Sequence, residues 1–208
     1  KYSKVAKAFI DKGYTVAVLE EPLDTGPFET LAFINLASSR ALKFFIELAF
    51  ALDAQGEFPA NTEEIILLGH SFGGSTVLSY LQGTCAAPLC IPGVPGVSIF
   101  EPVPQIKVAA GFGTSLIRRN LTDNSISWNE GLNNEGFPFF LINGNFDQRN
   151  FDTIDGVPVI DGSLDRLTPI NAFATLAGLD HYSIVDELIL AGAAFNNNQD
   201  SPAPREFQ

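Results

Sequence analysis

Apolar residues along the chain form short continuous runs, which are separated by longer stretches with helical spacing. Short apolar runs bounded by turn residues are typical of buried strands, and a repeat of about 3.6 residues indicates a helix packed on one face. The pattern predicts strands at 14–19, 64–68, 96–100, 137–142 and 172–176. It predicts helices at 2–12, from about 31 to 54, at 75–81 and at 182–194. Strands that alternate with helices predict an α/β protein with a mainly parallel sheet.

Several of these elements carry a more detailed expectation. The first helix ends at Gly13, and the β-branched run at 14–19 that follows it is predicted to be a buried strand. One face of the long second helix carries four apolar residues, Ala41, Phe45, Leu48 and Leu52. Residues 104–136 are polar with few strong signals, so we expect them to be irregular, and residues 150–169 are rich in turn signals.

Length and charge narrow the class of protein. The 208 residues show no repeat and no linker, so we expect one domain over 1–208 with a disordered polar tail at 196–208. A net charge of −12 argues against nucleic acid or anionic membranes as partners, since both need cationic patches. The longest hydrophobic stretch, 41–52, contains Lys43 and Glu47, so no transmembrane segment is expected in this acidic protein.

The most informative segment runs from Ile65 to Gly74 and places Gly-His-Ser-Phe-Gly-Gly directly after an apolar run. Strand, tight turn and helix, in that order, are the context in which Gly-x-Ser-x-Gly presents a nucleophilic serine. We expect the strand and helix to approach too closely for a Cβ at Gly69 or Gly73. We also expect Ser71 to hold a strained backbone with its hydroxyl above the sheet edge. The segment therefore nominates Ser71 as a nucleophile.

A serine hydroxyl is a poor nucleophile without a general base and a third group that orients the base. The chain has two histidines, His70 and His181. His70 is adjacent to Ser71 and cannot readily turn back onto its hydroxyl, so we expect it to line the elbow or to pack beneath it. His181 follows the predicted last strand, in a loop where a parallel sheet places its site, and is our candidate for the base.

Three carboxylates are candidates for the orienting acid. Asp147 lies at the tip of a turn after the predicted strand at 137–142, and it gives the chain order serine, acid, histidine. Asp165 lies so close before His181 that little room is left for a crossover, and Glu101 ends an earlier predicted strand. Asp147 is favoured, and Asp165 and Glu101 stay open.

These motifs together carry a family resemblance. Gly-His-Ser-Phe-Gly-Gly at 69–74, the Leu-Ile-Asn-Gly run that leads to Asp147, and Asp-His-Tyr-Ser at 180–183 resemble the α/β-hydrolase superfamily across nearly the whole chain. The His-Tyr-Ser ending and the cysteine-containing loop after the elbow helix are also similar to its chlorophyllase, dienelactone-hydrolase and platelet-activating-factor-acetylhydrolase-like branch.

The resemblance implies the three-layer, doubly wound α/β-hydrolase fold and a serine esterase or lipase that works through an acyl-enzyme without a cofactor. Ser71 would be the nucleophile, His181 the base and Asp147 the orienting acid. The Phe72 backbone N–H would be one oxyanion donor, with His70 lining the same site.

The substrates expected are small-molecule or lipid-like carboxylic esters. Aromatic residues at 72, 100, 112 and 137–140 could line an apolar pocket that favours hydrophobic esters, although such aromatics are more often core residues.

One departure from the family pattern concerns the N-terminus. In the family, the first helix follows a central strand whose trailing loop supplies the second oxyanion donor. Here that helix starts at Tyr2, so we expect the N-terminal strands to be missing and the second donor to lie upstream of Lys1. Losing one donor slows turnover by about 10² to 10³. A non-catalytic binding or scaffold protein of the same fold is therefore one alternative, and an acyltransferase with the same triad is another.

The two cysteines give information about the cellular compartment of the protein. Cys85 and Cys90 could close a disulfide, which requires an oxidising environment, or they could be two reduced buried thiols. Residues 120–122 fit an N-glycosylation site and also favour a secreted, soluble protein. No metal site is expected, because the two histidines and two cysteines lie in the wrong places for a tetrahedral set.

Overall fold

The structure is a computed structural model. The residues it describes are 2–19, 31–57, 60–82, 102–119, 125–129, 134, 137–147, 152–167, 171–181 and 183–184, with the side chains of 31–38, 118, 119 and 171 outside the description. In chain order the elements are α1 (Ser3–Ile10), α2 (Leu31–Ala54), β1 (Ile65–His70), α3 (Phe72–Gln82), β2 (Ile106–Phe112), β3 (Ile117–Arg119), β4 (Ile126–Trp128), β5 (Phe139–Gly144), β6 (Thr153–Ile154), β7 (Val157–Pro158), α4 (Val159–Arg166) and β8 (Asn171–Leu176).

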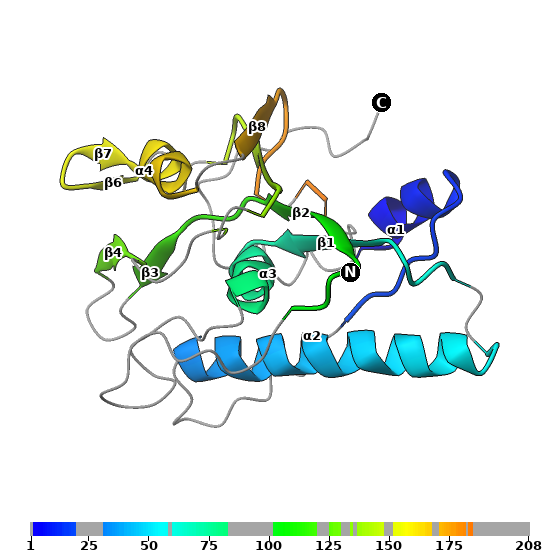
Figure 1. Ribbon diagram of the computed structural model, residues 1–208. Coiled ribbons are helices and arrows are strands. Elements are labelled where there is room, and N and C mark those ends of the chain that lie inside the picture. The colour runs from blue at the N-terminus through cyan, green and yellow to red at the C-terminus, as the bar shows by residue number, and fades with distance from the viewer. Residues whose placement is uncertain are drawn as a thin grey trace.

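A parallel sheet with the strand order β1-β2-β5-β8 forms the centre of the described chain (Figure 1). Each of its three pairings is parallel, and β5 pairs with β8 along its whole length. Because parallel strands end at the same edge of a sheet, the loops that follow these four strands lie side by side. This edge brings together segments that are far apart in the sequence.

Helices pack against both faces of the sheet. On one face, α3 packs against β1 and β2, and α2 packs along α3 (Figure 1). On the other face, Tyr2 and Val5 of the α1 region pack against the cluster of Phe112 and Ile184. The three-layer α/β architecture predicted from the sequence is therefore confirmed.

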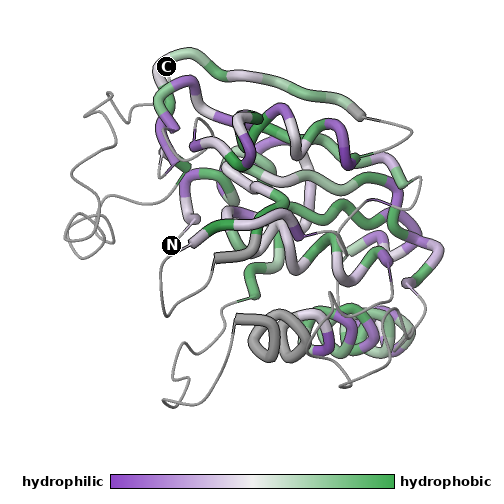
Figure 2. Tube along the Cα trace, turned by 90° about the vertical axis from the view of Figure 1, so that its left-hand side faces the viewer, coloured by the Kyte–Doolittle hydropathy of each residue, from purple (hydrophilic) through white to green (hydrophobic). Residues whose placement is uncertain are grey.

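Alternation along the strands divides the apolar residues between two clusters. On β5, Phe139 and Leu141 are buried in the larger cluster, between the sheet and α3, whereas Phe140 points the other way and is 41% exposed. From Gly74 to Leu81, every residue of α3 is buried, because this helix lies between the sheet and α2. Figure 2 shows apolar stretches along the strands in the centre of the view and also along α2 at its bottom.

Two small additions flank the sheet, in regions where the sequence predicted no regular elements. Strands β3 and β4 pair as an antiparallel hairpin, and β6 and β7 pair as another that leads directly into α4. The Trp128 side chain packs against Gly162 of α4, and the Arg166 guanidinium lies 4.1 Å from the centre of its ring. The expectation that 104–136 is irregular is thus wrong, since β2, β3 and β4 fall within it.

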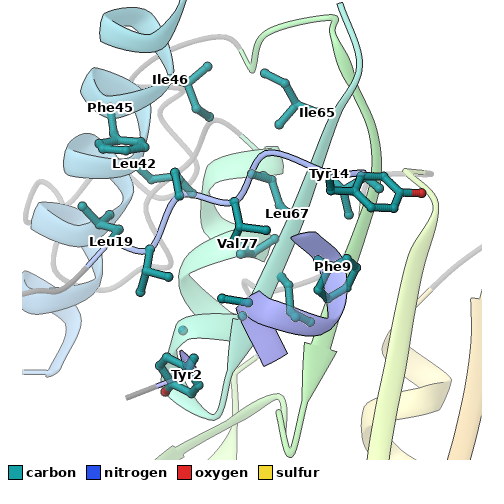
Figure 3. A pocket seen from close by; sticks show the side chains of 18 of the residues that line it. Tyr2, Phe9, Tyr14, Leu19, Leu42, Phe45, Ile46, Ile65, Leu67 and Val77 are labelled. Atoms are coloured by element: carbon teal, nitrogen blue, oxygen red, sulfur yellow. The ribbon is translucent and has the colours of Figure 1, made fainter. Parts of the chain in front are cut away.

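The predicted strand at 14–19 is wrong. This segment joins no strand among the described residues, and five of its six residues are exposed. β-Branched residues favour strands, but a strand is stable only when a neighbour completes its backbone hydrogen bonds. The segment instead borders an apolar cavity of about 500 Å³, together with β1 and with side chains such as Phe9 of α1 and Phe45 of α2 (Figure 3).

The buried face of α2 also differs from the predicted one. Ile46 is buried, and Leu42 and Phe50 pack with it in the larger cluster, whereas Leu48 is 41% exposed. Apolar residues occupy nearly every side of this helix, so their spacing alone cannot select the side that meets α3. No helix among the described residues is long and apolar enough to cross a membrane.

Other expectations lie outside the described residues. These are the strand at 96–100, most of the helix at 182–194, the tail at 196–208, the cysteine pair and the glycosylation motif at 120–122.

Gly162→Ala tests the contact between α4 and the β3–β4 hairpin. A Cβ at this position would lie 2.2 Å and 2.4 Å from two carbons of the Trp128 ring, so we expect the variant to lose about 1–3 kcal/mol of unfolding free energy. Urea unfolding measures the loss. Asp165→Ala, at an exposed position on the same helix, is the matched control. An unchanged midpoint for Gly162→Ala would contradict the packing described.

Tyr80→Phe tests a buried phenol in the larger cluster. Tyr80 is fully buried, and its hydroxyl accepts a hydrogen bond from the Val103 N–H at 3.3 Å. Burial raises the pKa of Tyr80 above its ordinary value of 10.0, so the folded protein keeps a proton that the unfolded chain loses. The tyrosine therefore contributes stability that is present below about pH 10 and is lost as pH rises further.

We expect Tyr80→Phe to lose about 1 kcal/mol near neutral pH and to approach wild-type stability above pH 10. Urea unfolding of both proteins across this range measures the difference between them. Tyr14→Phe is the control, because that ring is 50% exposed. A gap between Tyr80→Phe and wild type that stays constant into strong alkali would refute this explanation.

Candidate active site

The turn between β1 and α3 has the backbone that the sequence predicts. Ser71 holds a positive φ of 54°, which costs a non-glycine residue about 1–3 kcal/mol and confirms the expected strain. A Cβ at Gly69 would lie 2.3 Å from the Gly73 carbonyl oxygen, so close approach excludes a side chain there. At Gly73 a Cβ would meet nothing within 4 Å, so the same expectation is wrong for that position. The tighter contact lies at Gly74, where a Cβ would fall 1.9 Å from Thr114 Oγ1.

The loop after β2 holds this turn in place. The Ser71 N–H donates to the Phe112 carbonyl at 2.9 Å, and the Ser71 carbonyl accepts from Thr114 Oγ1 at 3.2 Å. Thr114 is buried, so its hydroxyl has few competing partners. These bonds fix both ends of the strained residue from a neighbouring strand. Sequence reasoning missed this support, although the apolar run from Ile106 to Phe112, broken only by Lys107, was a usable strand signal.

The structure brings His181 and Asp147 together. His181 Nδ1 lies 2.9 Å from Asp147 Oδ2, and both side chains are buried. A carboxylate can only accept, so Nδ1 carries the proton and Nε2 is the nitrogen with the lone pair. Asp147 follows β5 and His181 follows β8, so the pairing of these two strands places the two side chains side by side.

Two glycines permit the approach of these loops. A Cβ at Gly144 would lie 2.0 Å from the Leu179 carbonyl oxygen, so the turn after β5 lies directly against the loop that carries His181. Gly113 has a φ of 58°, and a Cβ there would lie 2.8 Å from His181 Nδ1 and 3.1 Å from Asp147 Oδ2. Gly113 therefore allows the loop after β2 to cover the histidine–carboxylate pair. Its role depends on contacts between distant segments, which no local pattern reveals.

A compact turn holds His181 between Asp180 and Ser183. Ser183 Oγ accepts from the Asp180 N–H at 2.7 Å and donates to Asp180 Oδ1 at 2.9 Å. The Ser183 N–H also donates to the Asp180 carbonyl at 3.3 Å. These bonds give a physical reason for the Asp-x-x-Ser spacing around the histidine.

His70 lies beside His181 and forms hydrogen bonds through both ring nitrogens. Its Nδ1 is 3.0 Å from the Tyr2 hydroxyl, and its Nε2 is 2.7 Å from the His181 carbonyl oxygen. The two imidazole rings have their centres 5.0 Å apart. His70 thus lines the elbow as expected and also contacts the loop that carries the second histidine.

These contacts place position 71 at the same edge as position 181. Ser71 follows His70, whose ring contacts the His181 loop, and it bonds to Phe112, whose neighbour Gly113 covers the His181 ring. Phe72 opens α3, so its backbone N–H belongs to the first turn, where helix donors have no partner within the helix. The edge therefore holds a strained serine, a buried imidazole–carboxylate pair and the first N–H group of a helix.

The alternative acids are placed differently. Asp165 lies on α4 and is exposed, and the structure does not bring it to His181. Glu101 lies outside the described residues. Among the aromatic residues considered for a pocket, Phe139 lies in the larger cluster and Phe112 in the one on the opposite face, so these two belong to the core. No group of three histidine, cysteine, aspartate or glutamate side chains within the described ranges could hold a metal ion.

No family model matches the chain, and no curated protein matches it. Several solved structures are similar to it, among them three enzymes or enzyme domains. One is MGS-MChE2, an α/β hydrolase enzyme from a metagenome of lagoon sediments at Mar Chica, Morocco, with 17% identity over 93% of this chain and 83% of that chain and a TM-score of 0.49. Another is the esterase domain of a Rhodothermus marinus protein, with 18% identity over 84% of this chain and 89% of that chain and a TM-score of 0.37.

The third is MGS-M1, an α/β hydrolase enzyme from a Medee basin deep-sea metagenome library. It is 14% identical over 93% of this chain and 73% of that chain, with a TM-score of 0.44. At such identities, the chemistry of this chain has to follow from its own side chains.

Proposed function

We propose that the chain is a serine hydrolase that cleaves carboxylic esters through an acyl-enzyme. Ser71 is the nucleophile, His181 the general base and Asp147 the acid that orients the base. The observation that carries the proposal is the buried 2.9 Å contact between His181 and Asp147, at the sheet edge where Ser71 holds a positive φ. A positive φ at a serine between a strand and a helix is a cost that a purely structural turn would avoid with glycine.

In the proposed mechanism each group has one step. Asp147 accepts a hydrogen bond from Nδ1–H, so Nε2 of His181 is the nitrogen that takes the Ser71 proton while Oγ forms its bond to the ester carbon. The charge that develops on the carbonyl oxygen is stabilised by the Phe72 N–H at the positive end of the α3 dipole. His181 then returns the proton to the leaving alcohol as the ester bond breaks. Water, deprotonated by His181, hydrolyses the acyl-enzyme and restores the Ser71 hydroxyl.

Hydrophobic esters are the substrate class that the surroundings favour. The apolar cavity of about 500 Å³ includes Phe72 and Gly73 in its lining, so it reaches the elbow itself. Leu42, Ile46 and Val77 are among its other lining residues (Figure 3). Such a lining stabilises an acyl chain by removing apolar surface from water, at about 25 cal/mol for each Å² buried.

Labelling with a fluorophosphonate tests the nucleophile. We expect the folded protein to gain one phosphonyl group on the peptide that contains Ser71, because only an activated serine attacks this probe. Mass spectrometry of the digested protein locates the label. Ser71→Ala should abolish it, whereas Ser125→Ala, at an exposed position, should leave it intact. A folded wild-type protein that stays unlabelled would rule out the serine mechanism.

A pair of aspartate variants tests the acid. Asp147→Asn replaces the acceptor at His181 Nδ1 with an amide that can donate there, which favours the wrong tautomer of the imidazole. We expect kcat for a chromogenic ester to fall by about 10⁴. Asp165→Asn should keep wild-type kcat, because that carboxylate is exposed on α4. The opposite result, with activity lost only in Asp165→Asn, would reassign the acid.

A further inference from the structure

The hydrogen bonds at His70 fix the position of its proton. Nε2 lies 2.7 Å from the His181 carbonyl oxygen, and a carbonyl oxygen can only accept, so Nε2 must be the donor. In the neutral ring, Nδ1 then carries the lone pair and accepts the Tyr2 hydroxyl proton at 3.0 Å. His181 has the opposite arrangement, with its proton on Nδ1 facing Asp147. The two histidines therefore hold opposite tautomers, each selected by its partner.

Two sets of hydrogen bonds meet at His181. The Tyr2 hydroxyl donates to the ring of His70, which donates to the backbone carbonyl of His181, and the ring of His181 separately donates to Asp147. The His181 ring is thus held by a carboxylate at one nitrogen, while its backbone is held by an imidazole. The His181 residue follows β8 in a loop, where ladder hydrogen bonds no longer fix the backbone.

We propose that His70 and Tyr2 form a positioning pair for His181. The His181 carbonyl selects the tautomer of His70, the Tyr2 hydroxyl holds the ring by donating to Nδ1, and His70 Nε2–H holds the His181 backbone so that the imidazole meets Ser71 in a productive geometry. The proposal rests on the function proposed above, because it assigns His70 a role in orienting the base. A small displacement of a catalytic group by a residue outside the chemistry can cost up to about 100-fold in rate.

Tautomers can be read directly, because the chain has only two histidines. In protein labelled with ¹⁵N-histidine, two-bond ¹⁵N–¹H correlation spectra distinguish a protonated Nε2 from a protonated Nδ1. At mildly alkaline pH we expect one ring of each tautomer, and the spectrum of His70→Gln should retain only the Nδ1–H ring of His181. A His70 ring protonated at Nδ1 in the wild type would overturn the proposal.

Two substitutions at His70 separate positioning from mere packing. The amide nitrogen of glutamine can occupy the place of Nε2, whereas that of asparagine reaches only the place of Nδ1. We therefore expect His70→Gln to keep most of the wild-type kcat, and His70→Asn to lower kcat by about 10- to 100-fold with little change in KM. Equal kcat values for the two variants would contradict a role for the Nε2 donor.

Tyr2→Phe completes the series by removing the hydroxyl that donates to His70 Nδ1. We expect its spectrum to keep the Nε2–H form of His70, which the His181 carbonyl requires, and its kcat to fall between those of wild type and His70→Asn because the ring is held at one nitrogen only. Lys7→Ala, which removes an exposed ion pair with Asp11 on the same helix, is the control and should match wild type. A Tyr2→Phe protein with wild-type kcat would refute a positioning role for the Tyr2 hydroxyl.

The outcomes separate the two proposals. A wild-type protein that is folded but unlabelled at Ser71 would refute the proposed serine-hydrolase function and, with it, the orienting role of His70. If the wild type is labelled and active but His70→Asn and His70→Gln have equal kcat values, only the positioning role of His70 is refuted.

Discussion

The hydrogen bond between His181 and Asp147 depends on backbone approaches that only glycine allows. Gly144 lets the turn after β5 lie against the loop after β8, and Gly113 lets the loop after β2 lie against both side chains. Parallel pairing of β5 with β8 sets the spacing within which these approaches occur. Burial then makes the contact electrostatically strong, because water does not screen it. The site is thus a product of sheet topology and small residues together.

Sequence patterns predicted those elements whose structure is determined by residues adjacent in the chain. The order of strand, glycine-flanked serine and helix is encoded within 65–82, and the structure has it there. The segment at 14–19 has an equally good strand pattern, yet a strand also needs a neighbour, and its own residues do not encode one. The helix α4 was not predicted for a related reason, because glycine is typical of a turn. The Trp128 ring occupies the space where a side chain at position 162 would lie, and this contact explains the glycine inside the helix.

The candidate site was predictable to a similar degree. His181 and Asp147 could be nominated because each follows a recognisable strand, and the structure places them in contact. Thr114 and Tyr2 could not be nominated, because their contacts with Ser71 and His70 join segments from different strands and helices. The contacts of His70 were predicted only in part. Its place beside the serine was clear from the sequence, but its bond to the His181 carbonyl belongs to the assembled edge.

The positive φ of Ser71 is maintained by partners remote in the sequence, one of them 43 positions away at Thr114. A chain that has formed β1 and α3 without docking β2 and the loop after it lacks two of the bonds that hold this serine in its costly conformation. Mild denaturation that frees that loop is therefore expected to release the strained turn while the flanking helix is still intact. The strained backbone of Ser71 is thus a property of the finished tertiary structure and is among the first features to be lost.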